Sequence, residues 1–200
     1  MRLALLPAAI ATLLPLAAAA QDKPVLAPTR DATIDYKVEG RGNTGPQSLR
    51  MMFTAGGKKM RIDMPGQPGF VVMDRTAGRM MIVMADARRY MEQPMPPGQQ
   101  GAFDLSENHS FTRKGTETIA GQRCTVWESK GEHAGTGCVT DEGLVLRGES
   151  VTPDGRQSKL IATAVSLAPI AATSFEAPAG FTKMEMPVMP PGARPGAPRP

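Results

Sequence analysis

The sequence is poor in aromatic residues and in the side chains that most often carry catalysis. Only nine of its 200 residues are Phe, Tyr or Trp, and it contains two histidines and two cysteines. His109 and His133 are far apart in the sequence and lack the neighbouring carboxylates or thiols of a zinc or iron site. No nucleophile motif of the G-x-S-x-G type occurs. We therefore expect no cofactor and no catalysis, with an uncharacterised enzyme as one alternative.

The chain also lacks a concentrated charge of either sign. Its formal net charge is +4 at pH 7. Lysines and arginines are scattered along the chain without interleaved aromatic residues, unlike the basic stripes of proteins that bind nucleic acid. We expect no nucleic-acid partner.

One long apolar run is present, and it lies at the N-terminus. Arg2 precedes the run from Leu3 to Leu16, and four alanines ending at Ala20 precede polar residues. This order is typical of a secretory signal peptide, so we predict cleavage near Ala20 and a periplasmic or secreted protein. Neither cysteine lies at the cleavage point, and no later stretch is long and apolar enough to span a bilayer. These features argue against a stable membrane anchor.

The two cysteines are expected to form a disulfide, because export places them in an oxidising compartment. An antiparallel hairpin turning at Gly131 would pair positions whose numbers sum to 262, which places Cys124 directly opposite Cys138. Directly opposed positions have Cα separations within disulfide range. A redox-active pair would have the C-x-x-C spacing instead.

Several segments of the chain alternate with the period of two that is typical of half-buried strands. In residues 31–39, for example, Ala32, Ile34, Tyr36 and Val38 alternate with charged or polar residues. Gly, Pro and Asp clusters separate the segments at roughly even spacing, which favours an antiparallel meander. The other expected strands are residues 48–54, 58–64, 70–75, 80–85, 123–129, 135–140, 144–150 and 157–167.

The expected strand 80–85 is apolar on both faces, so it should be covered on both sides by a second layer, a helix or an apolar ligand. Residues 98–108 could form a short helix. Six of the last 16 residues are Pro, a composition typical of an extended or disordered tail. We thus predict a signal peptide (1–20), a linker (21–30), a single β domain (31–184) and a Pro-rich tail (185–200).

Methionine is unusually abundant. The chain contains 14 methionines, and ten of them lie between Met51 and Met95. Flexible thioethers pack against irregular apolar shapes, so this cluster forms either core packing or a groove for a lipid or another apolar ligand. The ligand candidates that we expect on the inward face are Met60, Met64, Met80, Ile82 and Met84.

A smaller methionine group lies near the C-terminus. Thioethers are soft ligands that favour Cu(I), and no His or Cys lies beside this group. A Cu(I)-binding periplasmic protein is therefore an alternative function. Its ligands would be Met184, Met186 and Met189.

Three blocks of sequence resemble a family of exported bacterial domains of unknown function that is related to the LolA-like lipoprotein carriers. The blocks are FVVMDRTAGRMMIVMADARRYMEQP (70–94), GTETIAGQRCTVWE (115–128) and SFEAPAGFTKMEMP (174–187). The resemblance implies a strongly curved antiparallel sheet, an open half-barrel whose concave face holds acyl chains in the carriers. The chain departs from the carriers in having little helix.

Together these observations predict a mainly β fold, a curved antiparallel sheet in a LolA-like open half-barrel with at most one or two short helices. The expected function is a non-catalytic periplasmic binding or envelope-accessory protein. Its expected partner is a lipid, a lipoprotein acyl chain or another apolar ligand on the concave face of the sheet.

Overall fold

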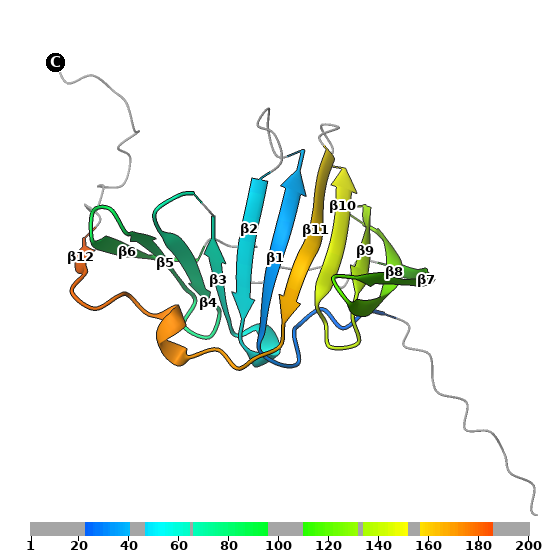
Figure 1. Cartoon of the computed structure of the whole chain (residues 1–200), viewed down its shortest axis with the longest axis horizontal. Coiled ribbons are helices and arrows are strands. Elements are labelled where there is room, and N and C mark those ends of the chain that lie inside the picture. The colour runs from blue at the N-terminus through cyan, green and yellow to red at the C-terminus, as the bar shows by residue number, and fades with distance from the viewer. Residues whose placement is uncertain are drawn as a thin grey trace, which may run out of the picture.

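The computed structural model describes residues 23–40, 47–64, 66–95, 110–131, 134–151 and 157–185. These residues form one open, curved sheet of twelve strands, drawn in Figure 1. The helices among them are two short 3-10 turns, η1 (Ala55–Gly57) and η2 (Ala172–Phe175). No helix in this part of the chain is long and apolar enough to cross a membrane. The predicted fold class, mainly β with at most two short helices, is confirmed.

The sheet consists of two antiparallel meanders that meet at its centre. In spatial order its strands are β12-β6-β5-β4-β3-β2-β1-β11-β10-β9-β8-β7. Strands β1 and β11 join the two halves, and β12 pairs with β6 in parallel at one edge. The strand bounds are β1 (Ala32–Glu39), β2 (Gln47–Phe53), β3 (Lys59–Asp63), β4 (Phe70–Asp74), β5 (Arg79–Met84), β6 (Arg89–Pro94), β7 (Ser110–Ile119), β8 (Gln122–Lys130), β9 (Gly135–Val139), β10 (Val145–Val151), β11 (Gln157–Ser166) and β12 (Thr182–Met184).

All nine predicted strands are present, with ends shifted by at most one residue. Strands β6, β7 and β12 were not among them. Strand β7 is a sheet edge with most side chains exposed on both faces, so its sequence carries no apolar alternation. The predicted helix over residues 98–108, the signal peptide and all but the first residue of the Pro-rich tail lie outside the described residues.

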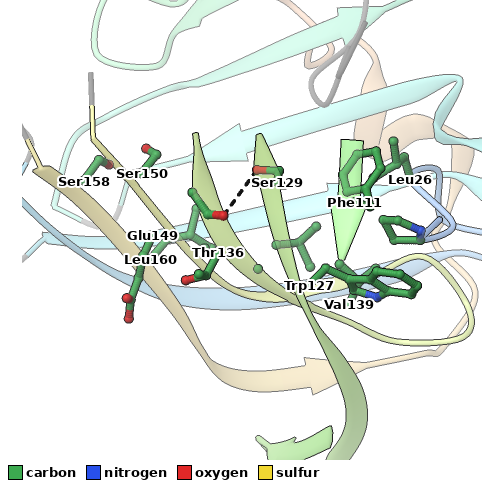
Figure 2. Close-up of a pocket in the computed structure, with 15 residues that line it drawn as sticks. Leu26, Phe111, Trp127, Ser129, Thr136, Val139, Glu149, Ser150, Ser158 and Leu160 are labelled. Atoms are coloured by element: carbon green, nitrogen blue, oxygen red, sulfur yellow. Dashed lines mark hydrogen bonds between the residues drawn. The ribbon is translucent and has the colours of Figure 1, made fainter. Parts of the chain in front are cut away.

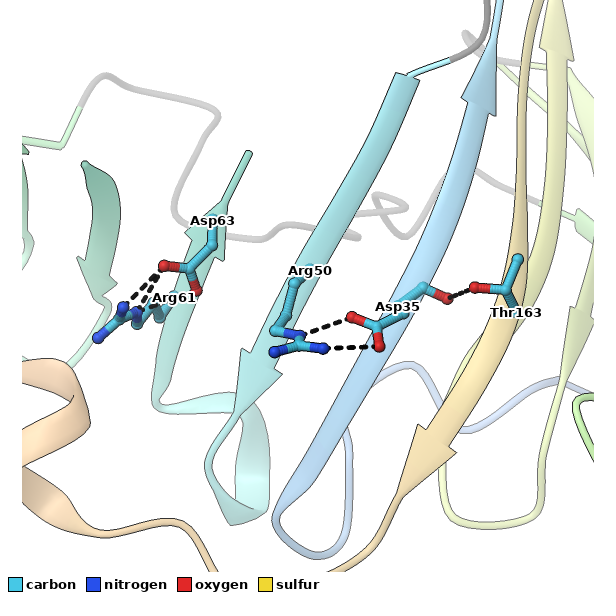
Figure 3. A network of polar contacts seen from close by, with 5 residues as sticks. All are labelled: Asp35, Arg50, Arg61, Asp63 and Thr163. Atoms are coloured by element: carbon cyan, nitrogen blue, oxygen red, sulfur yellow. Dashed lines mark hydrogen bonds and ion pairs between the residues drawn. The ribbon is translucent and has the colours of Figure 1, made fainter. Parts of the chain in front are cut away.

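Alternation gives the sheet an apolar face and a polar face. On the apolar face, Ile34 and Tyr36 of β1 are almost completely buried, and their cross-strand partners continue the core through β2 and β3. On the polar face, Arg50 forms a bidentate ion pair with Asp35, and Arg61 forms a second pair with Asp63 (Figure 3). The two faces follow directly from the period-two pattern of the strands.

A segment after β11, residues 167–181, crosses the polar face over β3 to β5, and we call it the strap. Its side chain Phe175 packs against Val72, Met81 and Val83, and all four are buried. Arg61 secures it by donating a hydrogen bond to the Ser174 carbonyl oxygen at 2.9 Å while its guanidinium stacks on Phe70. The strap is thus the second layer that the doubly apolar strand β5 required on this side.

The hairpin of β8 and β9 confirms the disulfide but corrects its predicted register. Cys124 and Cys138 are bonded, with a Cα–Cα distance of 5.4 Å. Val126, however, lies opposite Cys138, so paired positions sum to 264, not 262. The turn is centred one residue later than expected, and the disulfide joins diagonal positions, whose Cα separation is still within bonding range.

Candidate functional site

The apolar face is hollowed at the end of the sheet that contains β8 to β11, which we call the glycine end. The hollow is a groove of about 230 Å³ (Figure 2). Trp127, Val139, Val145 and Leu160 contribute apolar side chains from four different strands. Its lining is mostly apolar, with hydroxyl groups at one end. The groove is therefore chemically suited to an apolar ligand, because such sites combine apolar walls with a few polar groups.

The register shows how the groove is built. One transverse row on the apolar face reads Leu160, Gly148, Gly137, Trp127 across four neighbouring strands. Its two central members have no side chain, so the backbone of Gly137 and Gly148 forms the floor, with Leu160 side-chain atoms 3.5 Å from the Cβ position of Gly148. The outer members stand three strand spacings apart, about 14 Å. The result is a trough that runs along β9 and β10 between an indole wall and a leucine wall.

The two floor glycines are not required by the backbone. Neither adopts the left-handed conformation, and a Cβ on Gly137 or Gly148 would meet its nearest neighbour at an ordinary 3.5 Å. Gly135 differs, because a Cβ there would collide with the Glu149 carbonyl oxygen. Glycine inside a strand lowers stability and often marks a close approach to a ligand. Gly137 and Gly148 thus leave open a space that another residue could fill.

The walls of the trough are held firmly. Trp127 is the only tryptophan of the chain and is 7% exposed. Tyr36 donates a hydrogen bond to the Val145 carbonyl oxygen at 2.7 Å, and its burial raises the pKa of its phenol well above the ordinary value. Pro24 and Leu26, from the stretch that we expected to be a linker, also line the groove. The hydrogen bond from this phenol ties β1 to β10, the strand that carries Gly148 of the floor.

Two residues along the strands, the lining becomes polar. The parallel row reads Ser158, Ser150, Gly135, Ser129 on the same four strands. The Ser129 hydroxyl donates a hydrogen bond to the Gly135 carbonyl oxygen at 3.3 Å. Figure 2 shows Ser150 and Ser158 together at the end of the groove away from Trp127. We call Ser129, Ser150 and Ser158 the serine row.

The charged residues next to the serines in the sequence lie on the opposite, polar face of the sheet and neutralise each other. Glu149 contacts Lys159 at 3.1 Å and Arg147 at 3.3 Å. The hydrogen bond from Lys159, with a smaller one from Arg147, lowers the pKa of the Glu149 carboxyl. Arg147 is shared with Glu117 at 2.7 Å. The apolar face therefore carries the serine hydroxyls at this end, and the polar face behind them carries a compensated ion-pair cluster.

The residues predicted to bind a ligand lie at the other end of the sheet, which contains β3 to β6 and which we call the methionine end. Met60 lies on β3, Met64 directly after it, and Met80, Ile82 and Met84 on β5. Met60 pairs with Met73 and Met73 with Met80, so these thioethers share the apolar face. Met60 is buried in the core, whereas Met64 is 42% exposed. Met80, Ile82 and Met84 are half-buried in a row along β5. They form an apolar surface, and the groove lies elsewhere.

The tail methionines are only partly described. Met184 lies in β12, where its sulfur is 4.0 Å from an Arg89 guanidinium nitrogen. Met186 and Met189 lie outside the described residues. In the described part of the chain, no group of three or more His, Cys, Asp or Glu side chains could hold a metal ion.

The groove glycines were missed from the sequence, where glycine was interpreted as turn punctuation. The sequence does contain an indication of the groove. Gly137 and Gly148 fall inside predicted strands, and an isolated glycine in a strand indicates a bulge or a close backbone approach.

The open curved sheet with a groove on one face places the chain in a class of β proteins of which several structures are solved. It belongs to the family described as a domain of unknown function, DUF4412, whose model matches residues 43–144. The resemblance noted from the sequence, to a family of such domains, is confirmed. None of the curated proteins compared with the chain matches it.

Solved structures match the sheet over three quarters of the chain. An uncharacterised conserved protein from Thermus thermophilus has a TM-score of 0.53 and 10% identity, covering 78% of this chain and 90% of that one. The MucA/MucB complex of Pseudomonas aeruginosa has a TM-score of 0.51 and 18% identity, covering 76% and 57%. This chain thus spans little more than half the length of that one. A LolA superfamily protein from Nitrosomonas europaea also matches, at a TM-score of 0.39 and 11% identity, covering 76% and 92%. At these identities the first two matches establish a shared fold.

Proposed function

We propose that this protein is an exported, non-catalytic binding protein that holds the alkyl chain of a lipid or lipoprotein in the groove of its glycine end. The observation that carries the proposal is the floor of Gly137 and Gly148, which keeps a trough open where the backbone would accept side chains. The pattern of the first 20 residues, which is typical of a secretory signal peptide, supports export.

The shape of the groove favours a slender occupant. Its volume of about 230 Å³ lies below the roughly 300–1,000 Å³ of pockets that enclose drug-sized molecules. A single alkyl chain lying along β9 and β10 would contact the Trp127 and Leu160 walls on its two sides and the bare backbone below. Each buried methylene contributes about 0.8 kcal/mol, so even a short chain would bind measurably.

The methionine end is the second apolar surface and keeps its role as a predicted ligand contact. Three of its side chains are half-buried in a row along one strand, so an apolar ligand would contact them from one side only. They are Met80, Ile82 and Met84. The Cu(I) alternative keeps one described residue, Met184. The MucB structure contains MucA, so a protein of similar fold binds another protein.

The proposal is tested by titrating the purified protein with N-phenylnaphthylamine, an apolar dye that fluoresces in apolar surroundings. Trp127, as the only tryptophan, serves as the energy-transfer donor. We expect saturable binding with transfer from Trp127, and loss of both in Gly137→Val. Absence of saturable binding to the wild-type protein would contradict the proposal.

The matched control is Gly115→Val on β7, where a Cβ would meet nothing within 4 Å. It makes the same change of residue outside the groove, so it should leave dye binding unchanged. Because valine favours strands, Gly137→Val should gain about 0.5 kcal/mol of unfolding free energy while losing the ligand. Loss of binding in a destabilised Gly137→Val protein would not count for the proposal, so urea unfolding is measured alongside.

A further inference from the structure

We infer that the ligand is an amphiphile with an uncharged, hydroxyl-bearing head, which lies at the serine row while its chain lies in the trough. This inference rests on the proposed function and adds the class and the orientation of the ligand. It follows from the order of the rows along β9 and β10, and from the charged side chains of the described lining, which lie on the face opposite the serine row.

The order of the rows along the strands makes one end of the groove apolar and the other end polar. Along β9 the lining passes from Val139 through Gly137 to Gly135, a distance of about 13 Å at the usual rise per residue. The first position lies between apolar walls, and the last lies between Ser129 and Ser150. A chain that entered with its polar end first would bury that end against valine side chains. The favourable orientation therefore places the apolar end near Val139 and the head at the serine row.

A second hollow of about 430 Å³ lies at the same end of β9 to β11 and shares Ser150, Ser158 and Thr136 with the groove. The side chains of Thr136, Gln157 and Lys159 in its lining alternate with the serines along the strands, so they lie on the polar face of the sheet. On the apolar face the head meets the hydroxyls of the serine row and the Gly135 backbone, which suit a head that both donates and accepts hydrogen bonds.

The charges around the serine row favour an uncharged head. Among the described residues that line the two hollows, the charged side chains are Glu149 and Lys159, which pair with each other on the polar face, opposite the serine row. A carboxylate or phosphate head at the serine row would therefore meet no cationic side chain of this described lining. A hydroxyl-bearing head needs none, because its hydrogen bonds go to the serine hydroxyls.

The inference is tested by competition against N-phenylnaphthylamine with two probes that share one alkyl chain, monolauroylglycerol and laurate, at neutral pH and below their micelle concentrations. Monolauroylglycerol should displace the dye from the wild-type protein at a concentration roughly tenfold lower than laurate. Laurate displacing the dye at an equal or lower concentration would overturn the inference.

A double variant, Ser150→Ala with Ser158→Ala, tests the head position. It should bind monolauroylglycerol roughly tenfold more weakly, because two hydrogen bonds are lost, and should bind the dye as the wild type does. The control is Ser48→Ala with Ser166→Ala, two exposed serines outside the groove lining, which should change neither affinity. Unchanged monolauroylglycerol binding in the groove variant overturns the inference.

Binding of the dye distinguishes a failure of the proposed function from a failure of the inference about the head of the ligand. If the dye binds and the lipid probes show no preference, the proposed function stands and the inference fails. If the dye does not bind the wild-type protein, both fail. The probe comparison on the wild-type protein also needs no variant, so it decides the inference even if the double variant does not fold.

Discussion

The two ends of the sheet are apolar in different ways. The methionine end has many apolar side chains, which fill its apolar face, and the strap covers its polar face with Phe175. The glycine end also carries many apolar side chains, but two positions in the centre of its floor have none. This second arrangement leaves the apolar groove of Figure 2. A ligand site in this fold therefore depends on where side chains are missing, and not on how many apolar side chains are present.

The largest expected effect concerns the strap at the methionine end. Phe175 is 5% exposed and fills the centre of the second core cluster. Phe175→Ala should lower the unfolding free energy by about 3–5 kcal/mol, because it leaves a cavity and removes buried apolar area. Urea unfolding followed by circular dichroism measures this loss. If the loss were below about 1 kcal/mol, the strap would not be the second layer of this end.

The disulfide is the corresponding brace of the glycine end. Replacing both cysteines, in Cys124→Ala with Cys138→Ala, should lower the unfolding free energy by about 3 kcal/mol, because the loop that the bond closes is short. The check is the midpoint of thermal unfolding with and without reductant. The wild-type midpoint should fall on reduction and the variant midpoint should not, and an unchanged wild-type midpoint would contradict the assignment.

A smaller effect is expected from Asp31, which connects the strap to η1. Its carboxylate accepts hydrogen bonds from the backbone N–H groups of Ile170 at 3.0 Å and Ala55 at 2.9 Å. These bonds, that from Ile170 first, lower the pKa of Asp31 below its ordinary value of 3.8. The stabilisation is therefore complete above pH 3.8 and is lost as the pH falls through the lower, folded-state pKa.

Asp31→Asn should consequently be less stable than the wild type at neutral pH, by about 1 kcal/mol, since the carboxylate is largely open to solvent. The difference should shrink as the pH falls below 3.8. Unfolding midpoints in urea across this pH range measure it. A difference independent of pH would show that the charge of Asp31 does not hold the strap.

Much of the fold could be predicted from the sequence, because a strand with one buried face alternates apolar and polar residues with a period of two. Strand β1 is the clearest example, with Ala32, Ile34 and Tyr36 buried between more exposed neighbours. Strands β6, β7 and β12 could not be found in this way. They lie at or next to the sheet edges, where fewer side chains are buried and the alternation fades.

The candidate site was less predictable, because its position depends on long-range register. Gly137 and Gly148 are 11 residues apart, and only the pairing of β9 with β10 brings them side by side. A shift of two residues in the hairpin of β8 and β9, such as the one that separates the predicted register from the observed one, would replace Trp127 beside this pair. The methionines stand out in the amino-acid composition because they are abundant. The groove arises from absent side chains, which the composition does not reveal.

The most direct test of the groove as the ligand site is a single titration that reports on both ends of the sheet. The protein is labelled at the methionine methyl groups and at the Trp127 indole, and NMR spectra are recorded as monolauroylglycerol is added. We predict saturable shifts of the Trp127 indole resonance at lower ligand concentrations than any shift of the Met80 and Met84 methyls. Saturable shifts of those methyls with an unmoved Trp127 resonance would place the ligand at the methionine end and contradict the prediction.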